Sequence, residues 1–136
     1  MISLVMDTSN SYLAVGLFQD NMCLEAFQEK GSRRQSEKAI PTLKEVLDRH
    51  HIALKDVNEM IITSGPGSYT GVRVAMTIAK TLAAVSDVRI KSVSSLAAYA
   101  GMNQALSVID ARGHKVFVGV YENGLPLIKE QVMTLE

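Results

Sequence analysis

Three glycines lie within seven residues in the segment 65–71, between an apolar run at 60–62 and a long apolar run at 72–85. Glycine is used where the backbone takes a positive φ or approaches another group closely. At a junction from strand to helix, such a turn also leaves amide N–H groups at the helix start, where an anion can bind. The pattern therefore predicts a tight corner, carried by Gly65, Gly67, Ser68, Tyr69, Thr70, Gly71 and Arg73.

The corner does not match the two common nucleotide-binding motifs. A P-loop needs a lysine directly after its last glycine, and here Val72 follows Gly71. A dinucleotide-binding fingerprint needs a third glycine where Thr70 stands. We therefore favour a structural corner or a protein contact over direct contact with an anion. Arg73 in the first helical turn opposes the helix dipole, so we expect it to have an acidic partner or a ligand.

Composition is that of an ordinary globular protein, with 136 residues, 47% apolar and 21% charged. The 14 basic and 14 acidic residues balance, so any contact with RNA must be local or indirect. Cys23 is the single cysteine, which excludes an internal disulfide and a cysteine zinc site. The first apolar run stops at Asp7 without a basic leader, and no run approaches the ~20 residues of a membrane span. These features predict a cytoplasmic protein without a membrane segment.

Hydrophobic periodicity predicts an α/β fold. Alternation at the start predicts a three-stranded antiparallel meander, and helical spacing predicts two longer helices. After Gly101 the pattern begins again, because an apolar strand ends in Asp110 and a polar turn and an alternating strand follow. This repetition predicts a first lobe at residues 1–103 and the start of a second at 104–136. The expected strands are 2–6, 12–18, 22–28, 57–63, 88–93, 105–109, 115–121 and 125–133, and the expected helices are 35–50, 72–85 and 94–101.

The expected helix at 72–85 is apolar nearly all round. A sheet covers one side of a helix, so this composition predicts a second helix layer or a partner protein on the other side. The helix at 35–50 carries a narrower apolar stripe, and Ser36 is its expected N-cap.

Short polar side chains occupy the turn after the first strand, namely Asp7, Thr8, Ser9 and Ser11. Such a set suits a hydrated magnesium ion and phosphate oxygens. It is also typical of a hydrogen-bonded hairpin, and spacing alone favours the hairpin. Asp110 with Arg112 likewise predicts either a second polar site or an ion pair at a strand end.

Other candidate sites have less support. His50, His51 and His114 lack the spacing of metal ligands, so no metal site is expected. No motif in the sequence supports a catalytic nucleophile. A small basic cluster precedes the first helix; we expect it to be solvated surface, with contact to RNA or an acidic partner as the alternative. Its members are Lys30, Arg33, Arg34 and Lys38.

Three segments, residues 2–9, 65–73 and 108–112, together resemble the bacterial TsaB family, also called YeaZ. The resemblance implies the two-lobed, ribonuclease H-like fold shared by actin, sugar kinases and chaperone ATPases, with a mixed sheet flanked by helices. Chains of this family continue well beyond residue 136, so the resemblance also implies that the second lobe is incomplete here.

The resemblance implies a function in forming threonylcarbamoyladenosine on transfer RNA. The implied role is that of a noncatalytic scaffold and activator, which pairs with a TsaD-like transferase and works with a TsaE-like ATPase. Such chains form a homodimer in isolation and meet tRNA indirectly. Pairing is implied through the two longer helices, and the expected contact residues are Ile40, Leu43, Leu47, Val74, Ile78, Lys80 and Thr81.

TsaD-like paralogues carry a metal-binding histidine pair on the first helix, whereas residues 34–38 here contain no histidine. Metal-dependent catalysis is therefore not expected of this chain alone. The resemblance leaves open whether magnesium ATP or ADP binds at the partner interface. The alternative function is a nucleotide-binding ATPase or phosphotransferase of the same fold, with residues 7–11 as its phosphate hairpin.

Overall fold

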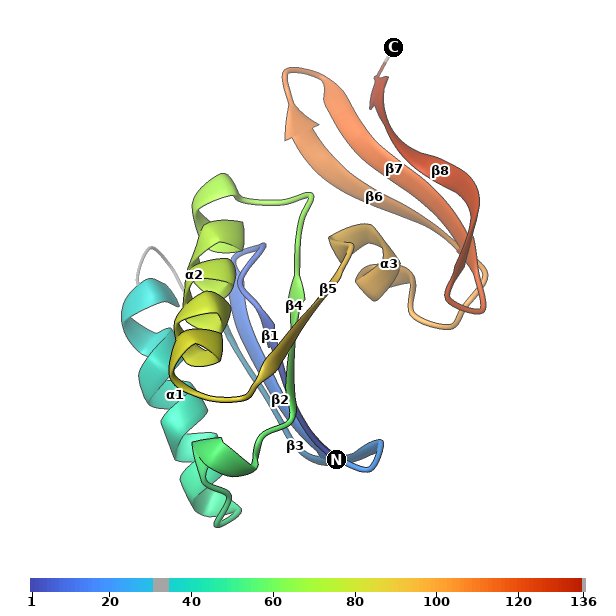
Figure 1. Cartoon of the computed structure of the whole chain (residues 1–136). Coiled ribbons are helices and arrows are strands. Elements are labelled where there is room, and N and C mark those ends of the chain that lie inside the picture. The colour runs from blue at the N-terminus through green and yellow to red at the C-terminus, as the bar shows by residue number, and fades with distance from the viewer. Residues whose placement is uncertain (31–34, 136) are drawn as a thin grey trace.

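The fold consists of two sheets and three helices, seen in a computed structural model that describes residues 1–30 and 35–135 (Figure 1). The elements in chain order are β1 (Ile2–Asp7), β2 (Tyr12–Gln19), β3 (Met22–Lys30), α1 (Gln35–Arg49), a 3-10 turn (Leu54–Asp56), β4 (Glu59–Thr63), α2 (Tyr69–Val85), β5 (Arg89–Val93), α3 (Ser95–Ala100), β6 (Ala105–Arg112), β7 (Lys115–Glu122) and β8 (Leu125–Thr134).

The first sheet has five strands in the order β3-β2-β1-β4-β5. The first three strands pair antiparallel through short turns, whereas β4 and β5 add in parallel to β1. Parallel neighbours need a long crossover, and α1 and α2 supply the two crossovers. Both helices lie on the same face of the sheet (Figure 1). The expected mixed sheet flanked by helices is therefore confirmed.

Alternate residues of the central strands build the core beneath α1 and α2. Pairing places Leu4 of β1 between Leu17 of β2 and Met60 of β4, and all three are fully buried. Because side chains alternate across a strand, the next inward positions also share this face. They meet the inward side chains of the helices, which include Ala39, Leu43, Val46, Ala75, Ile78 and Ala79.

The outer side of α2 is less apolar than its composition suggests. Its buried residues are Gly71, Ala75, Ile78 and Ala79, and α1 packs beside it as the second helix layer. The exposed positions along the middle of the helix are polar or small, namely Arg73, Thr77, Lys80, Thr81 and Ala84. Tyr69 and Val85, at its two ends, are exposed large apolar residues. Of the two kinds of cover that the composition predicted, the second helix layer is therefore confirmed, and a partner protein on this helix stays a prediction.

Two helix starts differ from the sequence-based expectation. Helix α2 begins at Tyr69 rather than at residue 72, because the Ser68 side chain caps it by accepting a hydrogen bond from the Gly71 amide at 3.2 Å. Ser36 lies inside α1 rather than at its N-cap, so that prediction is wrong. Pro41 lies in the interior of α1, where it removes one N–H donor from the helix.

The second sheet has the order β6-β7-β8 and is antiparallel throughout. Helix α3 packs on it through a small apolar cluster of Leu96, Ala100 and Tyr121. The meander of β6, β7 and β8 repeats the meander of β1, β2 and β3, as the sequence pattern suggested. The division into lobes at residue 103 stays a prediction.

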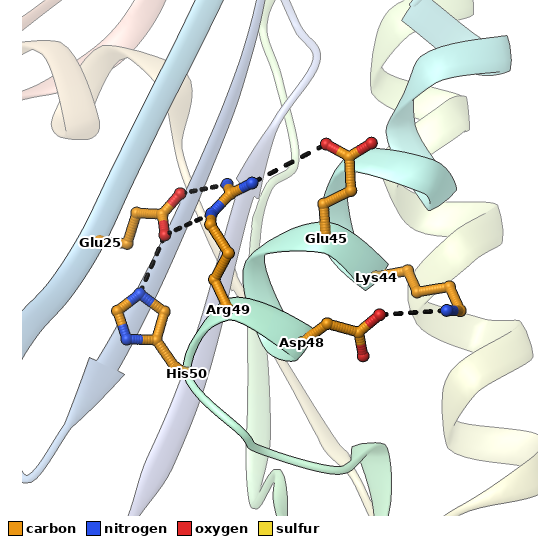
Figure 2. Close-up of polar contacts among 6 residues, drawn as sticks. All are labelled: Glu25, Lys44, Glu45, Asp48, Arg49 and His50. Atoms are coloured by element: carbon orange, nitrogen blue, oxygen red, sulfur yellow. Dashed lines mark hydrogen bonds and ion pairs between the residues drawn. The ribbon is translucent and has the colours of Figure 1, made fainter.

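A polar cluster ties the end of α1 to the edge strand β3 (Figure 2). Glu25 of β3 accepts hydrogen bonds from both Arg49 Nε, at 3.0 Å, and Arg49 Nη2. His50 Nε2 lies 2.9 Å from Glu25 Oε1. Glu45 lies 3.9 Å from Arg49 Nη1, one helical turn away. The hydrogen bonds from Arg49 are the main reason that the pKa of Glu25 falls to about 2.

The lowered pKa of Glu25 predicts how acid affects stability. An unfolded glutamate has a pKa of 4.5, so the contribution of Glu25 is complete above that pH and is lost as the pH falls towards about 2. In denaturant titrations, the difference in unfolding free energy between the parent and Glu25→Gln should shrink across this range. The exposed Glu37→Gln serves as the control on α1. An equal acid response of parent and Glu25→Gln would contradict the prediction.

Candidate functional site

A cleft of about 1020 Å³ brings together the three segments that stood out in the sequence. Its walls come from the turn after β1 (residues 9–11), the glycine corner (residues 67–71) and the end of β6 (residues 109–112). Ser36, Val74 and Phe117 complete the lining. Segments distant in the chain thus meet at one place, which makes this cleft the first candidate site.

The glycine corner packs directly on the turn after β1. The Ser68 amide donates a hydrogen bond to the Ser9 carbonyl at 2.8 Å, and the Thr8 hydroxyl donates to the Gly71 carbonyl. A Cβ on Gly71 would lie 1.9 Å from the Thr8 carbonyl oxygen, and one on Gly67 would lie 2.4 Å from that of Ser9. These positions admit only glycine because two backbones touch. The geometry supports a structural corner.

The polar residues of this turn are used within the chain. Asp7 Oδ1 accepts hydrogen bonds from the Ser9 amide at 2.8 Å, the Ser9 hydroxyl at 2.6 Å and the Thr63 hydroxyl at 2.6 Å. Thr8 is 0% exposed and Ser9 is 2% exposed. Of the four residues expected to bind a nucleotide, Ser11 alone is exposed. The hydroxyls of Thr8 and Ser9 therefore do not fit a cradle for magnesium and phosphate.

Among the described residues Arg73 has no acidic partner, so of the two predicted alternatives a ligand stays a prediction. Its guanidinium lies 5.2 Å from the centre of the Tyr69 ring, a cation–π contact between residues one turn apart. Because α2 begins at Tyr69, Arg73 also lies beyond the first turn, where the helix dipole opposes a cation less. Tyr69 is 75% exposed and lines the cleft.

Asp110 and Arg112 form a local turn rather than an ion pair. Asp110 Oδ1 accepts a hydrogen bond from the Arg112 amide at 2.7 Å, and Arg112 has a φ of +64°. Both residues line the cleft. The structure thus places the second expected polar site opposite the glycine corner, as part of the same cleft.

A second, apolar groove of about 390 Å³ runs between α1 and α2. Its floor contains Leu43, Leu47 and Ile78, which are buried in the chain's own core. Their role as contact residues stays a prediction, because the chain's own core already covers most of their surface. Ile40, which is 60% exposed, and the exposed Thr81 also line the groove.

Two other expected interface residues lie elsewhere, because Val74 lines the larger cleft and Lys80 is exposed outside both linings. Thr77, which lines the groove one helical turn before Thr81, was not among the predicted contact residues. The spacing of four residues between them is the signal that identifies it.

Three further predictions concern the basic cluster before α1, a metal site and a membrane span. Lys38 pairs with Glu29 at 3.1 Å, while Arg33 and Arg34 of the basic cluster lie outside the described residues. Within residues 1–30 and 35–135, no group of three or more histidine, cysteine, aspartate or glutamate side chains is placed to hold a metal ion. No helix in the same part of the chain is long and apolar enough to cross a membrane.

The fold places this chain in a structural class of proteins. A structure of the ethanolamine utilization protein EutJ from Carboxydothermus hydrogenoformans matches 99% of this chain and 52% of its own, with a TM-score of 0.56 and 14% identity. At this identity the likeness shows the fold alone. The sheet topology and the helices define a ribonuclease H-like, actin-like lobe of an α/β protein, which confirms the expected fold.

The family follows from closer matches. The model of the family described as TsaD, tRNA N6-adenosine threonylcarbamoyltransferase, matches residues 28–134. The Bacillus subtilis tRNA threonylcarbamoyladenosine biosynthesis protein TsaB is 34% identical over 92% of this chain. The structure of YeaZ from Pseudomonas aeruginosa has a TM-score of 0.88 and 29% identity over 97% of this chain. The chain belongs to the TsaB (YeaZ) family, which carries a TsaD-like domain.

The chain is shorter than these relatives. Its match covers 58% of the Bacillus subtilis protein and 67% of the Pseudomonas aeruginosa chain. The motif segments at 65–73 and 108–112 both fall within the part that the family model matches.

The close approach of Gly71 to Thr8 predicts whether Gly71→Ala raises or lowers the stability of the chain. In an ordinary helix, Gly→Ala stabilises by about 1 kcal/mol. Here the new Cβ would overlap the Thr8 carbonyl, so Gly71→Ala should instead destabilise the chain by about 3 kcal/mol. Chemical denaturation measures the change, with Thr70→Ala at the neighbouring exposed position as the control. A stabilised Gly71→Ala would show that the two backbones do not touch.

Proposed function

We propose that this chain is a noncatalytic scaffold and activator in the complex that installs threonylcarbamoyladenosine on tRNA. Membership of the TsaB family and the name of the Bacillus subtilis relative support the reaction. In this proposal the chain pairs with a TsaD-like transferase through α1 and α2, works with a TsaE-like ATPase and meets tRNA indirectly. It acts in the cytoplasm and forms a homodimer in isolation, and residues 104–136 open a second lobe.

The groove between α1 and α2 carries the proposal for pairing. An exposed isoleucine, Ile40, lies beside a floor made by Leu43, Leu47 and Ile78. Apolar side chains at a partly open groove favour burial by another protein, and covering an isoleucine contributes about 2 kcal/mol. Lys44, Thr77 and Thr81 line the same groove and provide a polar border. An apolar centre with a polar rim is the usual composition of a protein interface.

The contacts of the turn after β1 favour a scaffold over the alternative ATPase or phosphotransferase. A phosphate hairpin needs hydroxyls and a carboxylate that face the ligand. Here one oxygen of Asp7 receives three internal hydrogen bonds and the Thr8 hydroxyl is bonded to Gly71. This oxygen of Asp7 and the Thr8 hydroxyl are therefore not free to face a nucleotide.

Charging the rim of the groove tests the pairing. Ile40→Glu and Thr81→Glu should each weaken binding to a TsaD-like protein about 30-fold or more, because a carboxylate loses its water on docking. Co-purification and size-exclusion chromatography measure the loss, and circular dichroism reports whether the variants fold. Ile78→Glu is unsuitable because Ile78 is 7% exposed and supports the core.

Leu125→Glu is the matched control, because Leu125 is an equally exposed apolar residue on the second sheet. It should pair normally. Normal pairing by both groove variants would refute the proposed interface. Calorimetric titration with magnesium ATP separates the alternative function: saturable binding that disappears in Asp7→Ala would favour the ATPase or phosphotransferase.

A further inference from the structure

The chain is built from two bodies that do not share an apolar core. The first body is β1–β5 with α1 and α2, and its buried cluster extends from Leu4 to Val88. The second body is β6–β8 with α3, whose cluster is centred on Leu96, Ala100 and Tyr121. Among the described residues, no member of one cluster belongs to the other. Two bodies without a common core are expected to move relative to each other.

Helix α3 connects the bodies. It lies beneath the second sheet, next to the end of β5 (Figure 1), and packs on β6, β7 and β8. The Ser94 hydroxyl, which caps α3, donates a hydrogen bond to Glu130 of β8, and so does Tyr121 of β7. Helix α3 is therefore fixed to the second sheet by side chains as well as by apolar packing.

Two hydrogen bonds tie the same helix to the first body. At its start, the Ser95 amide donates to the Gly65 carbonyl at 2.9 Å. Near its end, Tyr99 Oη accepts a hydrogen bond from Asn10 Nδ2 at 2.6 Å. Tyr99 lies about one helical turn from Ser95, roughly 6 Å along the axis. The bond from Ser95 to Gly65 holds the start of α3 against the first body. The bond from Asn10 to Tyr99 holds its other end and so fixes the direction of the helix.

We propose that the Asn10–Tyr99 hydrogen bond is a latch, and that its release lets α3 and the second sheet turn about Ser95 and change the width of the cleft. The walls of the cleft belong to different bodies, because Gly67 to Gly71 lie on the first and Ile109, Arg112 and Phe117 on the second. A rotation of one body therefore changes the cleft directly. Asn10 itself lines the cleft, so an occupant there can compete with Tyr99.

The latch is exposed enough to open under ordinary conditions. Tyr99 is 47% exposed, and its hydrogen bond to Asn10 lies at the solvent-exposed surface. A solvent-exposed hydrogen bond contributes little net stability, so its loss moves an equilibrium between arrangements without unfolding either body. This inference does not depend on the proposed function, since it concerns two parts of one chain.

Distance measurement between spin labels on the two bodies tests the latch. Cys23, the single cysteine, is exposed on β3 and takes one label, and Lys129→Cys on the exposed strand β8 takes the other. In this labelled parent we expect one narrow distance distribution. Adding Tyr99→Phe removes the acceptor oxygen and keeps the ring. We expect a second or broader population, with the ratio of open to closed molecules rising about fivefold.

Tyr12→Phe is the matched control, because Tyr12 is also a partly exposed tyrosine, at 39%, and lies on the first body. It should leave the distribution narrow, and thermal unfolding should be alike in all variants. An unchanged narrow distribution in both Tyr99→Phe and Asn10→Ala would overturn the latch. A distribution already broad in the labelled parent would overturn it as well.

Discussion

The contact between the glycine corner and the turn after β1 is the constraint on which the rest of the structure depends. Two backbone segments approach until Gly71 meets the Thr8 carbonyl and Gly67 meets that of Ser9. This contact fixes where α2 begins relative to the central strand β1. Since α2 and α1 share one face of the sheet, the position of α2 also sets the groove between them. One contact without side chains thus positions both candidate surfaces.

The same contact limits the chemistry of the cleft. In this turn the Thr8 hydroxyl donates to the Gly71 carbonyl, and the Ser9 hydroxyl donates to Asp7. Buried polar groups need hydrogen bonds, and here the protein itself supplies them. Groups already satisfied in this way have little to offer a phosphate. The cleft keeps a polar wall, from Ser11, Tyr69 and Arg112, but the Thr8 and Ser9 hydroxyls are already bonded within the chain.

Much of the fold was predictable because it rests on local patterns. The order of strands and helices follows from periodicity, and the turn residues mark where elements end. The start of α2 at Tyr69 was not predicted, because its N-cap, Ser68, lies among glycines that are typical of a loop. The roles of Thr8 and Ser9 were not predictable, since they depend on a contact with residues about 60 positions away. Spacing within a hairpin cannot reveal such a contact.

The outer face of α2 shows that composition alone does not reveal which residues of a helix reach solvent. The number of apolar residues in α2 suggested an apolar surface on the side away from the sheet, yet the positions that reach solvent include Thr77, Lys80 and Thr81. Ala75, Ile78 and Ala79 are buried, and alanine makes up much of the apolar count without needing cover. The large apolar residues Tyr69 and Val85 are exposed, but they lie at the two ends of the helix. The large exposed apolar residue beside the groove is Ile40, and it comes from α1. A partner therefore has more to gain at the border between the two helices than on the outer side of α2.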